Sequence, residues 1–561
     1  MRRSTRSALL IALALFAAAC QQEADPSVTT PGESEPTTTA PPATTSTTIP
    51  DGEPTVVLSG DEDYPDGFTV PAGEIWAFDP DAATTVTVGA NVIVEGRLEM
   101  QPSSGDIEHV LVFEGVDESA FQGGGMEPIE SDVGLWVVGD GQLMIEGEEK
   151  TAWSYEYDPA WEGDEVLAAP NSPGDYETFE EVADTPPANE LGYPTELLNL
   201  TRNVRIEGTP DGYTHIFLRS EQPQTIRYAA VRYVGPRFGD TDTTGRYGMH
   251  FHMAGEGMSG SLVEGVVVRD AGNHAFVPHA SHGITFQDTI AYEVSNEAYW
   301  WDEPPEPPDD PDYDPINDTN DIVWDRAVAA KVSEGFAGSR FRLGAFFLAN
   351  GQNLTLTSSV AIAVEGDEET ERSGFVWSEA TGDVWNFENN IAHNNEANGI
   401  FVWQNTSLRH DVGDFTAYYN AAAGVNHGAY GNSYQYSDLT LLENGQAVIS
   451  HALGEESEGS DAQTWTNIVS EGGILVVEEH ETDAEAPVRF VDCDFSSVVV
   501  VDEEGGAPSD YEFVRCGLEP EEFDLEEAMT ESVFRVQRDD GSAFEIRGDG
   551  TVTDIEAFYS D

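Results

Sequence analysis

The chain has 561 residues, enough for two or three ordinary domains or for one long repeat domain. Asp and Glu number 105 against 24 Lys and Arg, and the formal net charge of −81 is spread along the whole chain. A field of this sign repels phosphate and excludes nonspecific binding of nucleic acid. The acidic excess has two explanations: adaptation of an exported surface to salt or calcium, or specific cation sites.

The first twenty residues have the pattern of a bacterial export signal. Basic residues precede an apolar run at 9–16, and three alanines lead directly to Cys20. This order predicts a signal peptide over residues 1–20 and a lipid attached to Cys20, with plain secretion as the alternative. The apolar run is too short for a stable membrane span. We therefore expect an exported protein that is lipid-anchored at the bacterial cell surface and faces outward.

Three segments of different texture follow the signal. Residues 21–54 are rich in Thr, Pro, Ser and Glu, which predicts a disordered tether from the lipid to the folded body. Residues 55–156 contain short β-branched runs broken by Gly and Asp, which predicts a small all-β domain. Residues 157–196 are acidic and rich in Pro, which predicts a linker.

A repeat of short strands begins near residue 197. Residues 263–276 align with residues 286–299 at an offset of 23, and related units recur further along. Such a repeat is typical of a β-solenoid, in which each coil buries its apolar face against its neighbours. We predict the solenoid over 197–515 and a C-terminal cap over 516–561. Asn residues that fit left-handed corners and stacked side-chain ladders recur at the turns, at Asn273, Asn296, Asn395 and Asn398.

Two cysteines lie near the end of the chain. Cys493 and Cys516 are separated by about one coil, so they are expected side by side on neighbouring coils. An exported protein can form a disulfide there, and two buried thiols are the alternative.

One segment of the repeat region points to a known family. Residues 244–255 contain His250-Phe251-His252 and resemble the Tyr-Pro-Ile-His-Phe-His motif of the cell-surface hyaluronidases, the family of the cell-migration-inducing, hyaluronan-binding protein and its transmembrane relative. The resemblance continues through 269–283, 346–350 and 389–395, and residues 138–147 resemble the family's eight-glycine domain. It implies an all-β protein in which a small eight-glycine domain precedes a right-handed parallel β-helix of the pectin-lyase-like kind. It also implies hyaluronidase-like cleavage of an acidic polysaccharide.

The chain departs from the family in two places. Only the segment 157–196 separates the eight-glycine-like part from the β-helix, whereas the animal enzymes carry a further domain there. In addition, Glu297 stands where the family has a histidine. These departures make the transfer of the fold safer than the transfer of the activity.

The His-Phe-His block also has a physical meaning of its own. His250 and His252 are two residues apart in an expected strand, so both imidazoles project to one face. Two histidines at this spacing can bind one metal ion or one polar group of a substrate. We predict a divalent cation, either calcium or a transition metal, as the cofactor at these two residues.

The 23-residue register extends this site to neighbouring coils. It stacks His274 on Glu297 and His279 on Asp302. If His252 lies in the coil beneath His279, then His252, His279 and Asp302 form a column. A ladder of structural histidines is the alternative.

Cleavage in such a site follows one of two routes, metal-assisted or acid/base. Residues expected at the chemical step are His250, His252, His279, Arg246 and Asp302, and His282 is a further candidate. Residues expected to bind substrate are Arg232, Arg269, His274 and Trp300.

The assignment of substrate-binding residues rests on arginines and aromatic rings. A third of all basic residues are arginines between 202 and 269, where a positive strip could hold carboxylates. Pairing of these arginines with nearby Asp and Glu is the alternative. Sugar rings stack on exposed aromatic side chains, and core filling is the alternative for each of those.

The sequence supports one leading function and two competitors. The first is a hyaluronidase-like, polysaccharide-active enzyme outside the cell. The second is a non-catalytic carbohydrate-binding or adhesion protein on the same solenoid, and the third is a structural envelope protein. The expected partners are an acidic polysaccharide and, through the lipid anchor alone, a membrane, and we expect a monomer.

Overall fold

A computed structural model of the chain describes most of the residues after position 51. The described ranges are 52–156, 165–168, 177–179, 188–237, 243–300, 319–333, 344–348, 351–365, 372–377, 385–402, 409–428, 433–451, 463–479, 487–502 and 508–560. The predicted signal, tether and Cys20 lie outside them. Within these ranges the chain forms strands, turns and short 3-10 helices, among them Glu118–Ala120 and Pro520–Glu522, and no α-helix. The same part of the chain offers no helix with the length and apolar content to cross a membrane.

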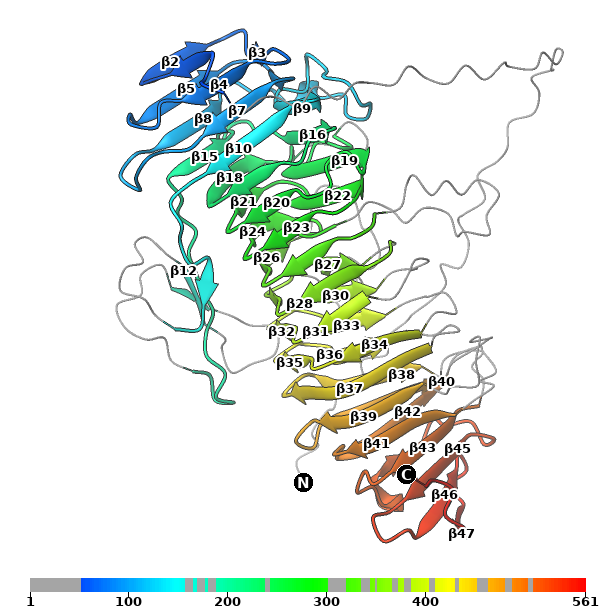
Figure 1. The fold of residues 1–561 in the computed structure, drawn as a ribbon. Coiled ribbons are helices and arrows are strands. Elements are labelled where there is room, and N and C mark those ends of the chain that lie inside the picture. Colours follow the sequence, from blue (N-terminus) through cyan, green and yellow to red (C-terminus); the bar gives the residue numbers. More distant parts are fainter. Residues whose placement is uncertain are drawn as a thin grey trace, which may run out of the picture. The chain divides into compact units, whose positions relative to one another are not determined.

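The strands fall into three parallel ladders, which the chain visits in turn (Figure 1). Ladder 1 contains β1 (Val56–Leu58), β4 (Ile75–Phe78), β7 (Arg97–Met100), β10 (Gln142–Glu146), β17 (Thr225–Arg227), β20 (Leu262–Glu264), β23 (Thr285–Gln287), β25 (Val323–Asp325), β28 (Leu354–Thr357), β31 (Trp385–Glu388), β34 (Arg409–Gly413), β37 (Ser433–Leu442), β39 (Thr464–Val469), β41 (Val488–Cys493), β43 (Asp510–Val514) and β45 (Val533–Gln537). Ladder 2 contains β2 (Asp61–Tyr64), β5 (Thr84–Val88), β8 (His109–Phe113), β15 (Val204–Glu207), β18 (Ala229–Val234), β21 (Val267–Ala271), β24 (Ile290–Ser295), β26 (Val328–Ser333), β29 (Val360–Ile362), β32 (Ile391–His393) and β35 (Thr416–Tyr418), and it merges into β37.

Ladder 3 carries the histidine block. Its strands are β3 (Phe68–Val70), β6 (Val92–Val94), β9 (Leu135–Gly139), β16 (Ile216–Ser220), β19 (Met249–Gly255), β22 (Phe276–Ser281), β27 (Gly344–Leu348), β30 (Ser373–Trp377), β33 (Asn398–Val402), β36 (Ala423–His427), β38 (Gln446–His451), β40 (Ile474–Glu479), β42 (Ser497–Asp502) and β44 (Phe523–Asp524). Tyr299 bridges β22 and β27 by pairing with Phe276 and with Phe346. The antiparallel strands β46 (Ala543–Arg547) and β47 (Val552–Ile555) follow β45 and end the strand order.

One coil therefore consists of a strand from each ladder, and successive coils pair in parallel. This is a parallel β-helix, which confirms the predicted fold class. The 23-residue repeat is confirmed as well, because Val263 pairs with Phe286 and Val268 pairs with Ala291. Alternate side chains point into the coils and form one continuous apolar core.

Residues 55–156 belong to the same stack of coils as the rest. We expected a separate domain there, but β10 pairs with β17 and β8 pairs with β15 across the expected linker. The core runs without interruption from Leu58 to Ile546. The structure therefore makes this segment the first coils of the β-helix and corrects the expectation of a separate core.

The expected linker is an excursion from within one coil, between β10 and β15. It contributes β12 (Glu165–Ala168) and β13 (Glu177–Phe179) to a small sheet, which the flanking strands β11 (Trp153–Ser154) and β14 (Leu197–Leu198) complete. Trp153 and Leu198 pack on the outer face of ladder 2, against Ile290 and Tyr292 among others. The excursion thus buries apolar side chains that a bare solenoid would leave in water.

A left-handed residue recurs at the corner between ladders 1 and 2. Each of the corner residues has a φ between +48° and +60°; they are Tyr228, Gly265, Asp288, Arg326, Ser358, Asn389 and Asp414. Of the four asparagines expected at left-handed corners, only Asn296 has a positive φ. The expected side-chain stacking does occur, because Asn296 Nδ2 donates to Asn273 at 2.9 Å and Asn395 Nδ2 donates to Asn420 at 2.8 Å.

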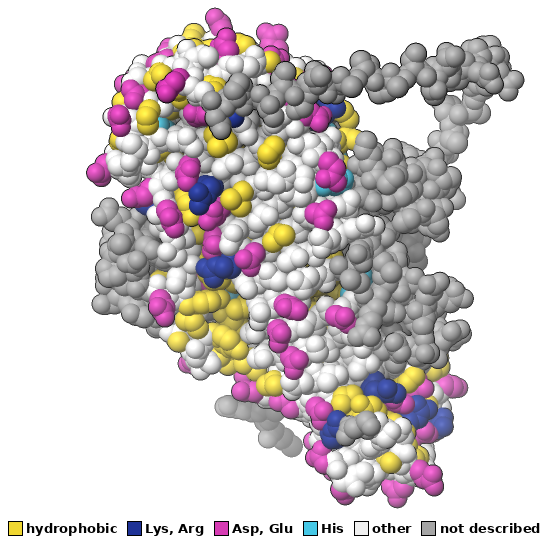
Figure 2. Space-filling view, in the orientation of Figure 1, with side chains coloured by type: hydrophobic (Ala, Val, Ile, Leu, Met, Phe, Trp, Pro, Cys, Tyr) yellow, Lys and Arg dark blue, Asp and Glu magenta, His cyan; other side chains and the backbone are white. Residues whose placement is uncertain are grey.

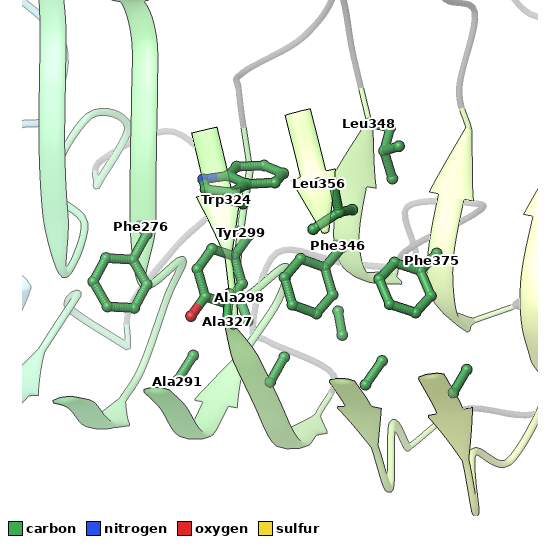
Figure 3. Close-up of a cluster of buried hydrophobic side chains, with 14 of the residues drawn as sticks. Phe276, Ala291, Ala298, Tyr299, Trp324, Ala327, Phe346, Leu348, Leu356 and Phe375 are labelled. Atoms are coloured by element: carbon green, nitrogen blue, oxygen red, sulfur yellow. The ribbon is translucent and has the colours of Figure 1, made fainter. Parts of the chain in front are cut away.

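Aromatic rings stack along the inside of ladder 3 (Figure 3). The ring centres of Phe276 and Tyr299 are 5.0 Å apart, those of Tyr299 and Phe346 are 4.5 Å apart, and those of Phe346 and Phe375 are 4.9 Å apart. The rings are nearly parallel and fully buried. This column holds together the coils next to the histidine block.

We predict that Phe346→Ala lowers the free energy of unfolding by about 3–5 kcal/mol, because it leaves a cavity between two stacked rings. Urea denaturation followed by circular dichroism measures the change. The matched control is Phe347→Ala, since Phe347 is the next residue on the opposite, partly buried face. Equal losses in the two variants would contradict the role of the column.

Candidate functional site

The side chains of strand β19 alternate between the core and the outer face of ladder 3. Met249 and Phe251 point inward and are fully buried in the core. The period of a strand then directs His250 and His252 outward. The register pairs His252 directly with His279 of β22, so the predicted column of these two residues is confirmed.

Three imidazoles converge on this outer face. His250 Nε2 lies 3.2 Å from His252 Nδ1, and His252 Nδ1 lies 3.2 Å from His279 Nδ1. One ring nitrogen from each of the three residues lies within 4.8 Å of the other two. His250 is buried, whereas His252 and His279 are partly exposed. We call these three residues the histidine cluster.

A turn before the strand fixes the ring of His250. His250 Nδ1 lies 2.8 Å from the carbonyl oxygen of Gly245. Because a carbonyl can only accept, Nδ1 carries the proton and Nε2 presents a lone pair to His252. Gly245 has a φ of +80°, a backbone conformation that glycine adopts without strain.

The surroundings keep His250 and His252 uncharged. Burial lowers the pKa of His250 well below its usual value, and positive charge on His252 or His279 would lower it further. Burial also lowers the pKa of His252 to about 3, with added repulsion from His279, Arg219 and Arg246. At neutral pH these two residues are therefore neutral imidazoles, which offer lone pairs and accept hydrogen bonds.

Arg219 is a neighbour of the cluster that the sequence analysis did not single out. It follows Leu218, which pairs with Phe251, so Arg219 and His252 occupy the same level of adjacent strands. Its ion pair with Glu127 is long, at 3.7 Å, and the two side chains are 37% and 84% exposed. The pair is therefore weak. The alternation of side chains along a strand could have indicated this position. Arg219 stands two residues after Phe217, which is paired with the outward-facing His250, so Arg219 points to the same face.

Arg246 has a different role from the one expected. Its side chain is fully buried, and Nε donates to Asp132 at 2.8 Å while Nη2 donates to the Gly124 carbonyl at 2.6 Å. The guanidinium also lies 4.6 Å from the ring centre of Trp136. Burial alone would raise the pKa of Asp132, but hydrogen bonds, including those from Gln122 and Arg246, outweigh it and hold the pKa below its usual value. The geometry makes Arg246 a buried structural cation.

His274 and Trp300 lie beside the cluster, but both side chains are buried. His274 Nδ1 is 3.0 Å from a carboxylate oxygen of Glu297, so the predicted stacking of these two residues is confirmed. The ring of Trp300 stacks on His274 at 3.9 Å between centres, and Trp300 is 2% exposed. A ring this buried offers no surface to a sugar. Glu297, which departs from the family pattern, serves here as the partner of His274.

Arg232 and Arg269 lie on ladder 2, not on the face of the histidine cluster. The two residues are paired in register on the adjacent strands β18 and β21. Both guanidinium groups contact Asp270, at 3.9 Å for Arg232 and 2.9 Å for Arg269. The other arginines of the expected positive strip also have partners inside the protein. Carboxylates pair with Arg205, Arg219, Arg227, Arg237 and Arg246, and backbone carbonyls accept from Arg202. Intramolecular pairing, the alternative in the sequence analysis, therefore describes this strip.

The remaining predicted residues are dispersed. Asp302 lies outside the described residues. His282 Nδ1 accepts from the backbone N–H of Asn320 at 3.1 Å. Cys493 and Cys516 each stand two residues beyond the paired Val491 and Val514, as expected for neighbouring coils, but both are buried free thiols and not a disulfide.

Comparison with known proteins gives one family match. Residues 215–306, which hold the whole histidine cluster, match the model of the CEMIP beta-helix family. No curated protein matches the chain. Among solved structures, the periplasmic alginate epimerase AlgG is 10% identical over 84% of this chain and 76% of its own, with a TM-score of 0.27. The receptor-binding protein of bacteriophage Det7, a podoviral tailspike in a myovirus, is 10% identical over 90% and 78%, with a TM-score of 0.24.

We predict that Arg246→Met lowers the free energy of unfolding by about 3–5 kcal/mol, because it leaves Asp132 as an unpaired buried charge. The double variant Arg246→Met/Asp132→Asn should recover part of this loss. Urea denaturation of both variants is the measurement. A single variant as stable as the unmodified protein would restore a functional role for Arg246 in place of the structural one.

Proposed function

We propose that this protein cleaves an acidic polysaccharide outside the cell, at the outer face of ladder 3. The observation that carries the proposal is the convergence of His250, His252 and His279 beside Arg219. The family match supports it, because the matched residues 215–306 include all four side chains. The resemblance of the His-Phe-His block to the cell-surface hyaluronidases supplies the substrate class.

The cluster is equipped for reaction at a sugar acid. Arg219 has only a weak, exposed partner, so a carboxylate of the polymer can replace Glu127 and form a bidentate pair. A carboxylate held there brings the adjoining glycosidic linkage toward His252. The linkage then lies against neutral imidazoles, whose lone pairs can accept a hydrogen bond from a water molecule or from the sugar. Attack by that water gives hydrolysis, and loss of a proton from the sugar ring gives elimination.

The aromatic side chains favour this proposal over a binding platform. A carbohydrate-binding face requires exposed rings on which sugars stack. Tyr299, Trp300, Trp377 and Trp385 are all at least 97% buried. Among the described residues of these coils, the outer face of ladder 3 therefore offers histidines and an arginine rather than a row of exposed rings.

The charge of the rest of the molecule opposes a polyanion. Acidic side chains are scattered over the face seen in Figure 2, and basic ones are few. Repulsion from a net charge of −81 acts over a Debye length, about 10 Å at 0.1 M salt. Salt should therefore assist the approach of an acidic polymer, which is the reverse of its effect on a basic polysaccharide-binding protein.

The first test is cleavage of a panel of polymers by the full chain. We expect shortening of hyaluronan or another acidic polysaccharide, no shortening of a neutral one, and faster initial rates at physiological than at low ionic strength. His252→Ala should lower the rate at least about 100-fold, since it removes a side chain that positions the reacting groups. The matched control His451→Ala should not, because His451 pairs with Glu478 on the same ladder but several coils away.

Two results would count against this function. The first is the absence of shortening on every acidic polymer, and the second is equal activity of His252→Ala and His451→Ala. Product analysis separates the two routes, since elimination leaves an unsaturated sugar that absorbs ultraviolet light and hydrolysis leaves none.

A second test addresses Arg219. We predict that Arg219→Ala raises KM for an acidic polymer about tenfold or more and changes kcat less, because it removes a binding contact to the carboxylate. Arg219→Lys should fall between the two, since lysine keeps the charge and loses the bidentate geometry. Arg515→Ala is the control, because Arg515 pairs with Asp492 near the far end of the stack. An unchanged KM in Arg219→Ala would remove Arg219 from the site.

A further inference from the structure

The geometry of the histidine cluster points to one transition-metal ion per chain. We propose that His250 Nε2, His252 Nδ1 and His279 Nδ1 bind a divalent cation of the zinc class, with the fourth position open on the outer face. This inference goes beyond the proposed polysaccharide activity and does not depend on it, because it rests on the donor atoms alone.

The separations of the donor atoms suit such an ion. Two of the nitrogen–nitrogen distances are 3.2 Å. In a tetrahedron with metal–nitrogen bonds of about 2.0–2.1 Å, two ligand nitrogens are about 3.3–3.4 Å apart. Two of the three separations therefore stand near the spacing that a tetrahedral ion imposes, and the third is at most 4.8 Å.

Hydrogen bonding alone does not satisfy these contacts. His250 Nδ1 gives its proton to Gly245, so Nε2 has only a lone pair for His252. One proton on His252 Nδ1 can point along only one of its two 3.2 Å contacts. If that proton is absent, two lone pairs face each other. A cation bound by all three nitrogens removes this conflict.

The hydrogen bond from the second ring nitrogen of His250 is also typical of a histidine that binds a metal. A ligating histidine usually donates its second N–H to a carbonyl or carboxylate, which fixes the tautomer and the ring. The Gly245 carbonyl does this for His250. The strand pairing of β19 with β22 fixes the other two backbones, so the three donors are largely preorganised.

The donor set distinguishes between the two kinds of cation that the sequence left open. Imidazole nitrogens suit zinc, copper, nickel and iron, whereas calcium takes six to eight oxygen ligands. Among the described residues, the group contains three histidines and no carboxylate. A set of three histidines with one open position is the arrangement of catalytic rather than structural zinc. His252 and His279 are partly exposed, so the open position is accessible from outside.

The test is equilibrium binding of Zn²⁺ to the metal-stripped full chain, in competition with a chromogenic chelator. The 105 acidic residues bind cations weakly, so the titration is done in physiological salt with excess Mg²⁺ and Ca²⁺ to occupy them. We expect one tight ion per chain. Co²⁺ in its place should give the visible absorption of a tetrahedral nitrogen site.

Variants assign the ion to the cluster. His252→Ala and His279→Ala should each weaken the affinity at least about 100-fold, because loss of an outer partner alone costs 10–100-fold. His252→Gln repeats the test with a side chain of similar size in case the alanine variant folds poorly, and circular dichroism checks folding. The matched control His451→Ala, with its Glu478 partner on ladder 3, should bind like the unmodified protein.

Three outcomes would overturn the inference: no tight Zn²⁺ binding, equal binding by the His252 and His451 variants, or displacement of Zn²⁺ by Ca²⁺ at comparable concentration. The failure of this inference and that of the proposed function can be told apart. Tight zinc binding without cleavage of any polymer leaves the metal site and removes the enzyme. Cleavage by a protein that shows no tight Zn²⁺ binding leaves the enzyme and removes the metal site.

Discussion

The register between successive coils is the constraint on which the rest of this structure depends. In a parallel ladder a residue lies directly above its partner in the next coil, and a slip of one residue would exchange the inner and outer faces. The pairing of Phe251 with Pro278 and of His252 with His279 is one case of this rule. The same register that places Phe276, Tyr299 and Phe346 in one stacked column inside ladder 3 places the histidines in one column outside it. The apolar core and the histidine cluster therefore lie on the inner and outer faces of ladder 3, and the same strand register positions both.

The register also explains why the site can hold neutral histidines in a molecule of such high negative charge. An exposed histidine in an acidic field would gain a proton easily. Here Tyr247, Val277 and Trp300 pack together next to His250, whose side chain is buried. Burial and the nearby guanidinium groups of Arg219 and Arg246 lower the pKa of His252 against the field of the whole protein. Local desolvation therefore outweighs long-range charge, which salt screens.

Periodicity made the local part of this arrangement predictable, and contacts distant in sequence made the rest unpredictable. The spacing of His250 and His252 and the 23-residue offset placed both imidazoles on one face and His274 beside Glu297, but they gave the pairing of His252 with His279 only as a condition. They could not show that Arg246 turns inward, because its partner Asp132 is 114 residues away in a different coil. The corner positions were equally hidden, since Tyr228 and Arg326 take left-handed conformations that favour glycine and asparagine. Arg219 was visible as a residue but not as a neighbour, because the loop between β18 and β19 obscured the register of one coil.

The first coils of the stack are part of the site. Asp132 and Gly124, which hold Arg246 in the wall behind the cluster, come from the segment that the sequence suggested to be a separate domain. Glu127, the exposed partner of Arg219, belongs to the same segment. Strand β9 of that segment pairs in register with β16, which in turn pairs with β19. A boundary drawn at residue 156 would therefore cut through the support of the histidine cluster. Because each coil buries its apolar face only against its neighbours, the cluster depends on the coils before it as much as on its own strands.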